Sequence, residues 1–214
     1  MNDHSSVPFY ANTTDNTHCF QAVLRMVLGY FEPGYVIDWE TLDTVTAKAP
    51  GLWTWPMAGL LWLKKRGYDV CNIEVFDYDS FASKGKDYLA QVYGQEVAES
   101  QARHSRIEDE QDRARLFSQL IATEQRIPSY VDVKKLLDQG FLIIVNINAC
   151  ALEEQTGYSG HIVLITAYDA EGLVLQDPGL PPHPERRVAY TVFEKAWAYP
   201  NQSAKNLVAL RLQK

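Results

Sequence analysis

HCFQAVLRMVLGYF, residues 18–31, is the most informative stretch of this sequence. Its apolar residues recur at helical spacing nearly all round, which predicts a helix buried in the centre of the domain. Pro33 and Gly34 follow and should end the helix. Cys19 stands in its first turn, where unpaired backbone N–H groups and the helix dipole favour a thiolate. Because a thiolate beside a base is a competent nucleophile, Cys19 is a candidate catalytic residue.

The segments after this helix alternate in pattern between helix and strand. A short helix and turn are expected over residues 39–50, and a second helix ends before Gly67. The later segments predict strands over 70–76, 141–148, 160–169, 172–177 and 204–214, a short helix over 131–140, and a strand followed by a helix over 185–197. Helices in the first half and a mostly antiparallel sheet in the second define an α+β fold.

The size and charge of the chain exclude several classes of protein. Its 214 residues predict one domain over residues 1–214, large enough to fold without a metal or a disulfide. The formal net charge of −7 provides no basic excess, so nucleic acid and anionic membranes are poor candidate partners. The longest apolar runs are far shorter than the roughly 20 residues that span a bilayer. The polar N-terminus also lacks the pattern of a signal peptide.

The three cysteines are Cys19, Cys71 and Cys150. Their odd number and wide spacing do not indicate a disulfide framework, and there is no CxxC motif for structural zinc. We therefore expect a reduced, cytoplasmic protein whose chemistry requires no metal or organic cofactor. Cys71 lies in an alternating strand and is expected in the core. Cys150 follows a strand end, where either a structural or a chemical role is open.

Residues 92–127 differ from the rest of the chain in their high density of charge. Glu99 with Arg103 and Asp109 with Arg113 form i,i+4 pairs in the order that favours a helix. The segment is predicted to be a charged helical insertion on the surface that adds little to the core. The alternative is a lid, or a helix on which a protein partner docks.

Among the histidines, His161 has the most suggestive position. It follows the turn GYSG and opens a hydrophobic strand, so its ring can stand at the end of a sheet. Asp177 ends the next strand, and Pro178 holds it in extended backbone. The hairpin between the two strands returns Asp177 toward His161, where a carboxylate can fix the imidazole tautomer. A structural histidine and a turn carboxylate are the alternatives. His18 adjoins Cys19, but neighbouring side chains at a helix start diverge.

A cysteine at the start of a central helix, a histidine that opens a later strand and an acidic residue on the next strand follow the chain order of papain-like cysteine enzymes. The sequence resembles the bacterial family thirty-nine-like cysteine peptidases, relatives of the domain that cleaves double-glycine leaders from bacteriocins. The matching pieces, in the family's order, are VPFYAN…DNTHC, W-x-W-x4-L-x-WLKKRGYDV, VDVKKLLDQGFLIIVNIN, GYSGHIVLITAYD and VLQDPG. The resemblance implies a papain-like fold with Cys19 as nucleophile, His161 as general base and then acid, and Asp177 as orienting residue.

The sequence departs from the family's pattern at two places near the cysteine. The family uses a Gln side chain before the cysteine to help bind the oxyanion. Here Asn12 stands in that region, one residue further from Cys19, and Asn16 is a second candidate. We predict that Asn12 lines the cleft with its amide nitrogen toward the site. Phe20 replaces a Gly that keeps the cleft open, so a narrowed cleft is expected.

Two classes of function remain open at this point. The leading hypothesis is a thiol-dependent hydrolase that cleaves a peptide or amide bond of a peptide or protein substrate through a thioester intermediate. An acyltransferase would use the same triad with another acceptor. The rival is a non-catalytic papain-like pseudoenzyme or peptide-binding module, which Phe20, the missing Gln and the charged helix favour.

Overall fold

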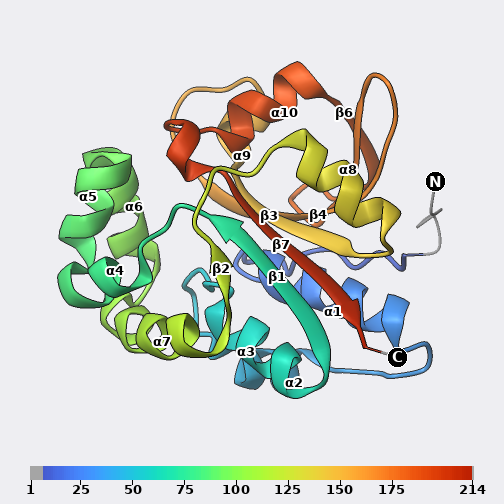
Figure 1. Cartoon of the computed structure of the whole chain (residues 1–214), viewed down its shortest axis with the longest axis horizontal. Coiled ribbons are helices and arrows are strands. Elements are labelled where there is room, and N and C mark those ends of the chain that lie inside the picture. Colours follow the sequence, from blue (N-terminus) through green and yellow to red (C-terminus); the bar gives the residue numbers. More distant parts are fainter. Residues whose placement is uncertain (1–6, 214) are drawn as a thin grey trace.

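A seven-stranded sheet forms the centre of the molecule (Figure 1). This computed structural model describes residues 7–213, so both ends of the expected domain extend slightly beyond the described part. The strands are β1 (Tyr68–Glu74), β2 (Thr123–Glu124), β3 (Leu142–Asn148), β4 (Gly160–Tyr168), β5 (Gly172–Asp177), β6 (His183–Ala189) and β7 (Asn206–Leu212). They lie in the order β2-β1-β7-β3-β4-β5-β6. Across this described part, β1 and β2 are parallel and the other neighbours are antiparallel, which confirms the predicted sheet.

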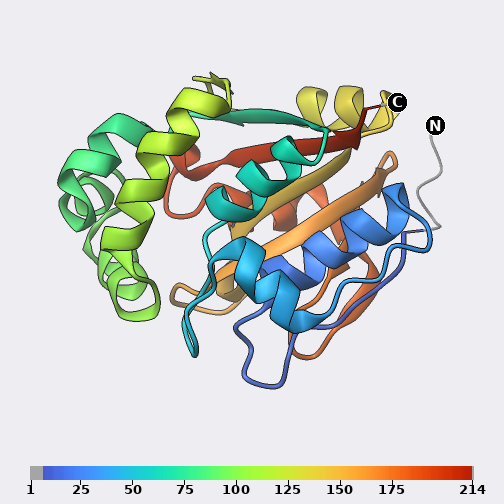
Figure 2. The same ribbon diagram turned by 90° about the horizontal axis from the view of Figure 1, so that it is seen from below.

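Helices cover both faces of the sheet (Figures 1 and 2). One face carries α1 (Cys19–Phe31), α2 (Trp39–Thr46) and α3 (Met57–Lys65), and the other carries α8 (Tyr130–Asp138), α9 (Ala149–Leu152) and α10 (Tyr190–Trp197). Successive side chains of a strand point to opposite faces. Ile144 therefore belongs to the core under α1, and its neighbour Ile143 belongs to the core under α8 and α10. The mixed helix and sheet content confirms the α+β class.

The central helix α1 is buried as predicted, and it begins at Cys19. It packs on β4 and β7, with Leu24 and Leu28 fully buried between the helix and the sheet. Asn12 Oδ1 accepts a hydrogen bond from the backbone N–H of His18, which satisfies one of the unpaired groups where the helix begins (2.7 Å). Cys19, the candidate nucleophile, therefore stands at a helix N-terminus that the Asn12 side chain and the packing on the sheet hold in place.

The segment after β1 forms four helices at one end of the sheet (Figure 2). They are α4 (Tyr78–Lys84), α5 (Lys86–Tyr93), α6 (Gln95–His104) and α7 (Ile107–Leu120). The prediction that residues 92–127 add little to the core is wrong, because Phe117 is fully buried and Ile121 is 3% exposed. Some of the segment's apolar residues, such as Val97 and Phe117, lie on the inner sides of α6 and α7, whereas Leu116 and Leu120 are exposed. Whether a protein partner docks on the outer, charged side stays a prediction.

We expect Phe117→Ala to lower the free energy of unfolding by about 3–5 kcal/mol, the usual cost of deleting a buried aromatic ring. The Phe117 ring contacts the Tyr78 ring, with centroids 4.7 Å apart. Leu116→Ala is the matched control, because Leu116 is the preceding residue of α7 and is 44% exposed. Urea unfolding of the two variants checks this. Equal small losses would mean that the α4–α7 segment contributes little to the core.

Candidate active site

The fold brings the start of α1 against the start of β4. The imidazole of His161 and the backbone N–H groups of Phe20 and Ile162 lie close enough to the Cys19 sulfur to influence the pKa of its thiol. His161 and Ile162 belong to β4, whereas Phe20 follows Cys19 in α1. The thiol therefore lies where the helix N-terminus meets the first two residues after Gly160, near the His161 imidazole and two backbone N–H groups.

Asp177, at the end of β5, holds the other side of the imidazole. His161 Nε2 lies 2.7 Å from Asp177 Oδ1, and this leaves Nδ1 as the nitrogen for Cys19. The Gly179 N–H donates to the same carboxylate oxygen at 3.0 Å. His161 is 8% and Asp177 is 3% exposed, so the pair is shielded from water. The structure brings together the three residues that the sequence nominated as nucleophile, base and orienting residue.

Cys19 and His161 each shift the pKa of the other in the direction that favours the charged form. Burial raises the pKa of Cys19, but the hydrogen bond and charge of His161 and the two backbone donors outweigh it and lower the pKa below its ordinary value. Burial lowers the pKa of His161, but the hydrogen bonds and charges of Asp177 and Cys19 outweigh it and raise the pKa. Both shifts favour a thiolate beside an imidazolium. The surroundings of Cys19 therefore favour the form of the thiol that a nucleophile needs.

Arg186 is a site residue that the sequence reasoning missed. Its Nη1 donates to Asp177 Oδ2 at 2.9 Å and also pairs with Glu153. The sequence could have indicated this residue. Arg186 and Arg187 are consecutive in strand β6, so their side chains must point to opposite faces of the sheet. The Arg187 side chain is 74% exposed and the Arg186 side chain is 19% exposed. Arg186 fixes the second carboxylate oxygen while His161 holds the first.

Asn12 is buried directly before α1. Its Oδ1 accepts hydrogen bonds from the backbone N–H groups of His18 and Thr13, at 2.7 and 2.9 Å. Its own N–H donates to the Pro178 carbonyl at 2.8 Å, which ties this loop to the residue after Asp177. Its Nδ2 donates to Asn16 Oδ1 at 3.0 Å, and no other described residue accepts from it. The other N–H of the Asn12 amide has no acceptor among the described residues. Asn12 is not among the residues that line the cavity beside Cys19, and its role as an oxyanion donor stays a prediction.

Asn16, the second oxyanion candidate, is exposed and adopts a left-handed backbone with φ of 57°. Asn tolerates this conformation better than most residues. Its Oδ1 faces the Asn12 amide as an acceptor. In this structure Asn16 orients Asn12, and a direct role in binding the oxyanion stays a prediction.

We expect Asn12→Ala to lower turnover by about 10²–10³, the usual cost of removing one oxyanion donor. Alkylation of Cys19 forms no oxyanion, so its rate should hardly change. Asn16→Ala is the control that keeps the Asn12 amide and removes only its partner, and it should lose less turnover. A parallel fall of turnover and alkylation in Asn12→Ala would instead show that Asn12 only builds the loop.

The expected narrowing of the cleft by Phe20 is wrong. Phe20 is fully buried, and its ring lies against Gly59 of α3, where a Cβ would come within 2.6 Å of Phe20 Cε1. Successive residues of a helix point about 100° apart around its axis. The ring therefore enters the core while the Cys19 sulfur faces β4. Gly59 has no side chain, and this leaves room for the Phe20 ring.

The remaining candidate side chains lie outside this group. The His18 ring contacts Thr13 Oγ1 at 2.6 Å and Asp43 at 3.2 Å, which agrees with its rejection as the base. Burial raises the pKa of Cys71, the opposite of a reactive thiol. Within residues 7–213, no three His, Cys, Asp or Glu side chains converge as metal ligands would. None of the helices described is both long and apolar enough to cross a membrane.

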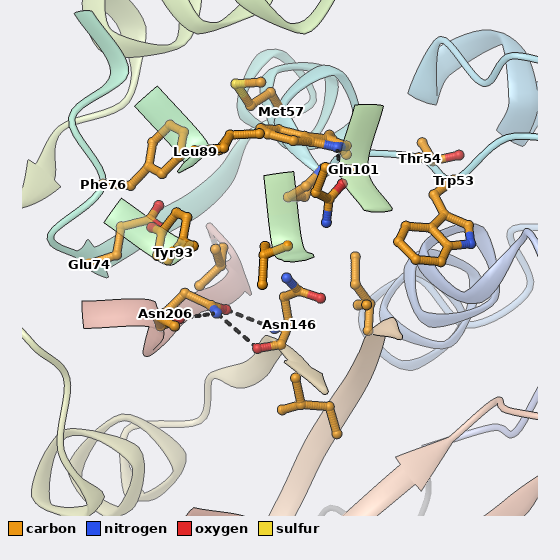
Figure 3. A pocket seen from close by; sticks show the side chains of 18 of the residues that line it. Trp53, Thr54, Met57, Glu74, Phe76, Leu89, Tyr93, Gln101, Asn146 and Asn206 are labelled. Carbon is orange, nitrogen blue, oxygen red and sulfur yellow. Dashed lines mark hydrogen bonds between the residues drawn. The ribbon is translucent and has the colours of Figure 1, made fainter. Parts of the chain in front are cut away.

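A cavity of about 170 Å³ opens beside Cys19. Figure 3 shows Trp53 and Thr54 at one end of it, Glu74, Phe76 and Tyr93 at the opposite end, and Gln101 and Asn146 between them. Phe20 does not line it. A cavity of this size accepts a group as large as benzene. The site therefore combines a nucleophile with adjacent space for part of a substrate.

A helix that begins at a cysteine, packed on an antiparallel sheet whose strands carry the histidine and the aspartate, is the arrangement of the papain-like fold. The sequence profile of the Peptidase_C39 like family matches residues 4–205, so the chain belongs to this family. It is also similar to a crystal structure from Bacillus anthracis described as a C39-like peptidase, with 16% identity and a TM-score of 0.52 over 98% of this chain and 96% of that one. At that identity the likeness shows the fold alone. None of the curated proteins matches the chain.

Proposed function

We propose that this protein is a cysteine peptidase that cleaves a peptide or amide bond with Cys19, His161 and Asp177. The observation that carries the proposal is the position of the His161 imidazole, which lies beside the Cys19 thiol and favours its thiolate while its Nε2 is held by Asp177 at 2.7 Å. Papain-like chemistry needs both pairings, the nucleophile with the base and the base with the orienting residue. The family and fold support the class of reaction, and the cavity beside Cys19 supports a substrate.

In the first half of the reaction, the Cys19 thiolate attacks the substrate carbonyl carbon and a C–S bond forms. The carbonyl oxygen becomes negative and accepts hydrogen bonds from the Cys19 backbone N–H and the Asn12 amide. The imidazolium of His161 gives its Nδ1 proton to the amine nitrogen as the C–N bond breaks. The amine leaves, and the acyl group remains on sulfur as a thioester.

In the second half, water attacks the thioester while His161 accepts one of its protons at Nδ1. The C–S bond breaks, the carboxylic acid product leaves, and the thiolate and imidazolium are restored. Asp177 stays ionised throughout and keeps the imidazole oriented. If an amine or alcohol replaces water, the same residues perform acyl transfer.

The test is cleavage of a mixed peptide pool, followed by mass spectrometry of the products. We expect cleavages that disappear in Cys19→Ala and after treatment with iodoacetamide. Cys71→Ala is the matched control, since Cys71 is partly buried against the core on the opposite face of the sheet. If Cys19 alkylates rapidly near neutral pH and no peptide or amide is cleaved, the non-catalytic binding module becomes the better interpretation.

A further inference from the structure

The cavity beside Cys19 extends along one end of the sheet as far as Glu74. Glu74 of β1 pairs with Asn206 of β7, and Asn146 of β3 pairs with Ile162 of β4. Asn206 and Asn146 are joined by two hydrogen bonds, with the Asn146 N–H donating at 2.7 Å and Asn206 Nδ2 donating at 2.9 Å (Figure 3). These four residues form one cross-strand row. The row begins at Glu74 and ends at Ile162, whose backbone N–H lies near the Cys19 sulfur.

The lining of the cavity is aromatic, with a single carboxyl group. Its rings come from Trp53, Trp55, Phe76, Tyr78, Tyr93, Phe117, Tyr158 and Tyr199. Among the described residues that line it, Glu74 is the only Asp, Glu, Lys, Arg or His. Aromatic faces with one carboxylate are suited to a cationic nitrogen, because the ring quadrupoles and the negative charge attract it together. An anionic group would be repelled by the Glu74 carboxylate.

The helices α5 and α6 hold the outer wall of the cavity in place. Gln101 of α6 accepts a hydrogen bond from Trp55 Nε1 at 3.0 Å and donates to the Tyr158 hydroxyl at 2.9 Å. Tyr93 and Leu89 of α5 face the same cavity. Side chains of α5 and α6 therefore form the wall of the cavity opposite the sheet.

The Glu74 carboxyl group has one oxygen in use and one free. Its Oε1 accepts hydrogen bonds from Asn72 Nδ2 at 2.9 Å and from the Tyr78 hydroxyl at 2.5 Å. No described residue donates to Oε2, and no positive side chain lies against the group. Burial raises the pKa of Glu74, and the two hydrogen bonds only partly offset this. Oε2 of this partly exposed carboxyl group is therefore available to a positively charged partner.

We propose that the cavity between Cys19 and Glu74 is a specificity pocket for a cationic nitrogen of the substrate, with Glu74 as its counter-ion. This rests on the proposed hydrolase function of Cys19. Three strand spacings separate β4 from β1, so the nitrogen binds roughly 14 Å from the reacting carbonyl along the sheet. A long basic side chain or the free N-terminal amine of a short peptide segment can supply it.

The first experiment labels Cys19 and does not require turnover. One iodoacetamide carries an aminohexyl arm, and a second carries an uncharged heptyl arm of matched length. In both cases the thiolate forms an S–C bond and iodide leaves, and mass spectrometry of the Cys19 peptide gives the rate. We expect Glu74→Gln to lower the ratio of the amine rate to the alkyl rate by about tenfold or more. Gln keeps an acceptor for Asn72 and Tyr78, so the fold should be retained.

Two controls isolate the pocket from the thiol. Plain iodoacetamide should alkylate Cys19 at the same rate in Glu74→Gln and in the unaltered protein. Glu99→Gln removes an exposed carboxylate from the outer side of α6 and should leave the rate ratio unchanged. An unchanged ratio in Glu74→Gln would overturn the proposed pocket, even if peptides are cleaved. A reduced ratio without any peptide cleavage would support the pocket and count against the hydrolase.

The second experiment identifies the source of the cation. Peptides that carry lysine or uncharged norleucine at each position are compared, with the N-terminus either free or acetylated. A preference for lysine that Glu74→Gln removes assigns the pocket to a side chain. A preference for the free N-terminus that Glu74→Gln removes assigns it to the chain end. Cleavage without either preference would contradict the proposal.

Discussion

His161→Ala is expected to reduce turnover by several orders of magnitude, because catalytic triad members act as a unit. It should also raise the pH midpoint of Cys19 alkylation to at least the ordinary thiol pKa of about 8.5. The hydrogen bond and charge of His161 lower the pKa of Cys19, whereas burial raises it. Removing the imidazole leaves burial opposed only by the backbone N–H groups of Phe20 and Ile162.

The measurement is the alkylation rate of Cys19 between about pH 5 and 10, with peptide turnover assayed in parallel. In the unaltered protein the thiolate should persist below the ordinary thiol pKa, so alkylation continues on the acid side of it. His104→Ala is the control, since His104 stacks on Trp53 and does not contact Cys19. An unchanged midpoint in His161→Ala would show that the helix N-terminus sets the reactivity without the imidazole.

Asp177→Asn should lower turnover by up to about 10⁴, as an amide cannot support the imidazolium or fix its tautomer in the same way. Alkylation of Cys19 should persist, with its midpoint shifted upward as the pKa of His161 falls. Glu171→Gln, in the exposed turn of the same hairpin, should leave both rates unchanged. Turnover and alkylation are measured alongside thermal unfolding.

The same variant has a predicted effect on acid stability. Burial raises the pKa of Asp177, but His161, the Gly179 N–H and Arg186 lower it to about 2, from an ordinary value of 3.8. A lowered carboxyl pKa stabilises the fold above the ordinary pKa, and that stabilisation is lost as the pH falls from about 4 to 2. The unaltered protein should therefore lose more free energy of unfolding across this range than Asp177→Asn does. A variant that is unfolded at pH 7 would show that Asp177 is primarily a structural turn carboxylate.

The candidate triad was predictable because each member carries a local signal. Cys19 stands at the beginning of an apolar helix, His161 opens an apolar strand after a turn, and Asp177 precedes a proline. The hairpin of β4 and β5 then brings His161 and Asp177 together within a short stretch of chain. Local patterns of this kind depend on backbone preferences and on hydrophobic periodicity, which a sequence displays directly.

Other features depended on where side chains point in the packed structure. Phe20 follows Cys19 in sequence, but its direction is set by the space at Gly59, which a distant helix provides. Phe117 belongs to a highly charged segment, yet it is buried because the two sides of α7 face different surroundings. The charge density of a whole segment does not distinguish the buried side of a helix from its exposed side.

The residues of the chain alone therefore determined the α+β class, the helix that begins at Cys19 and the identities of His161 and Asp177. Tertiary structure decided the pairing of Asp177 with Arg186 and the row from Glu74 to Ile162. The physical reason is that this row joins strands far apart in sequence. Its cross-strand partners depend on register and strand order, which arise only when the sheet and its covering helices pack together.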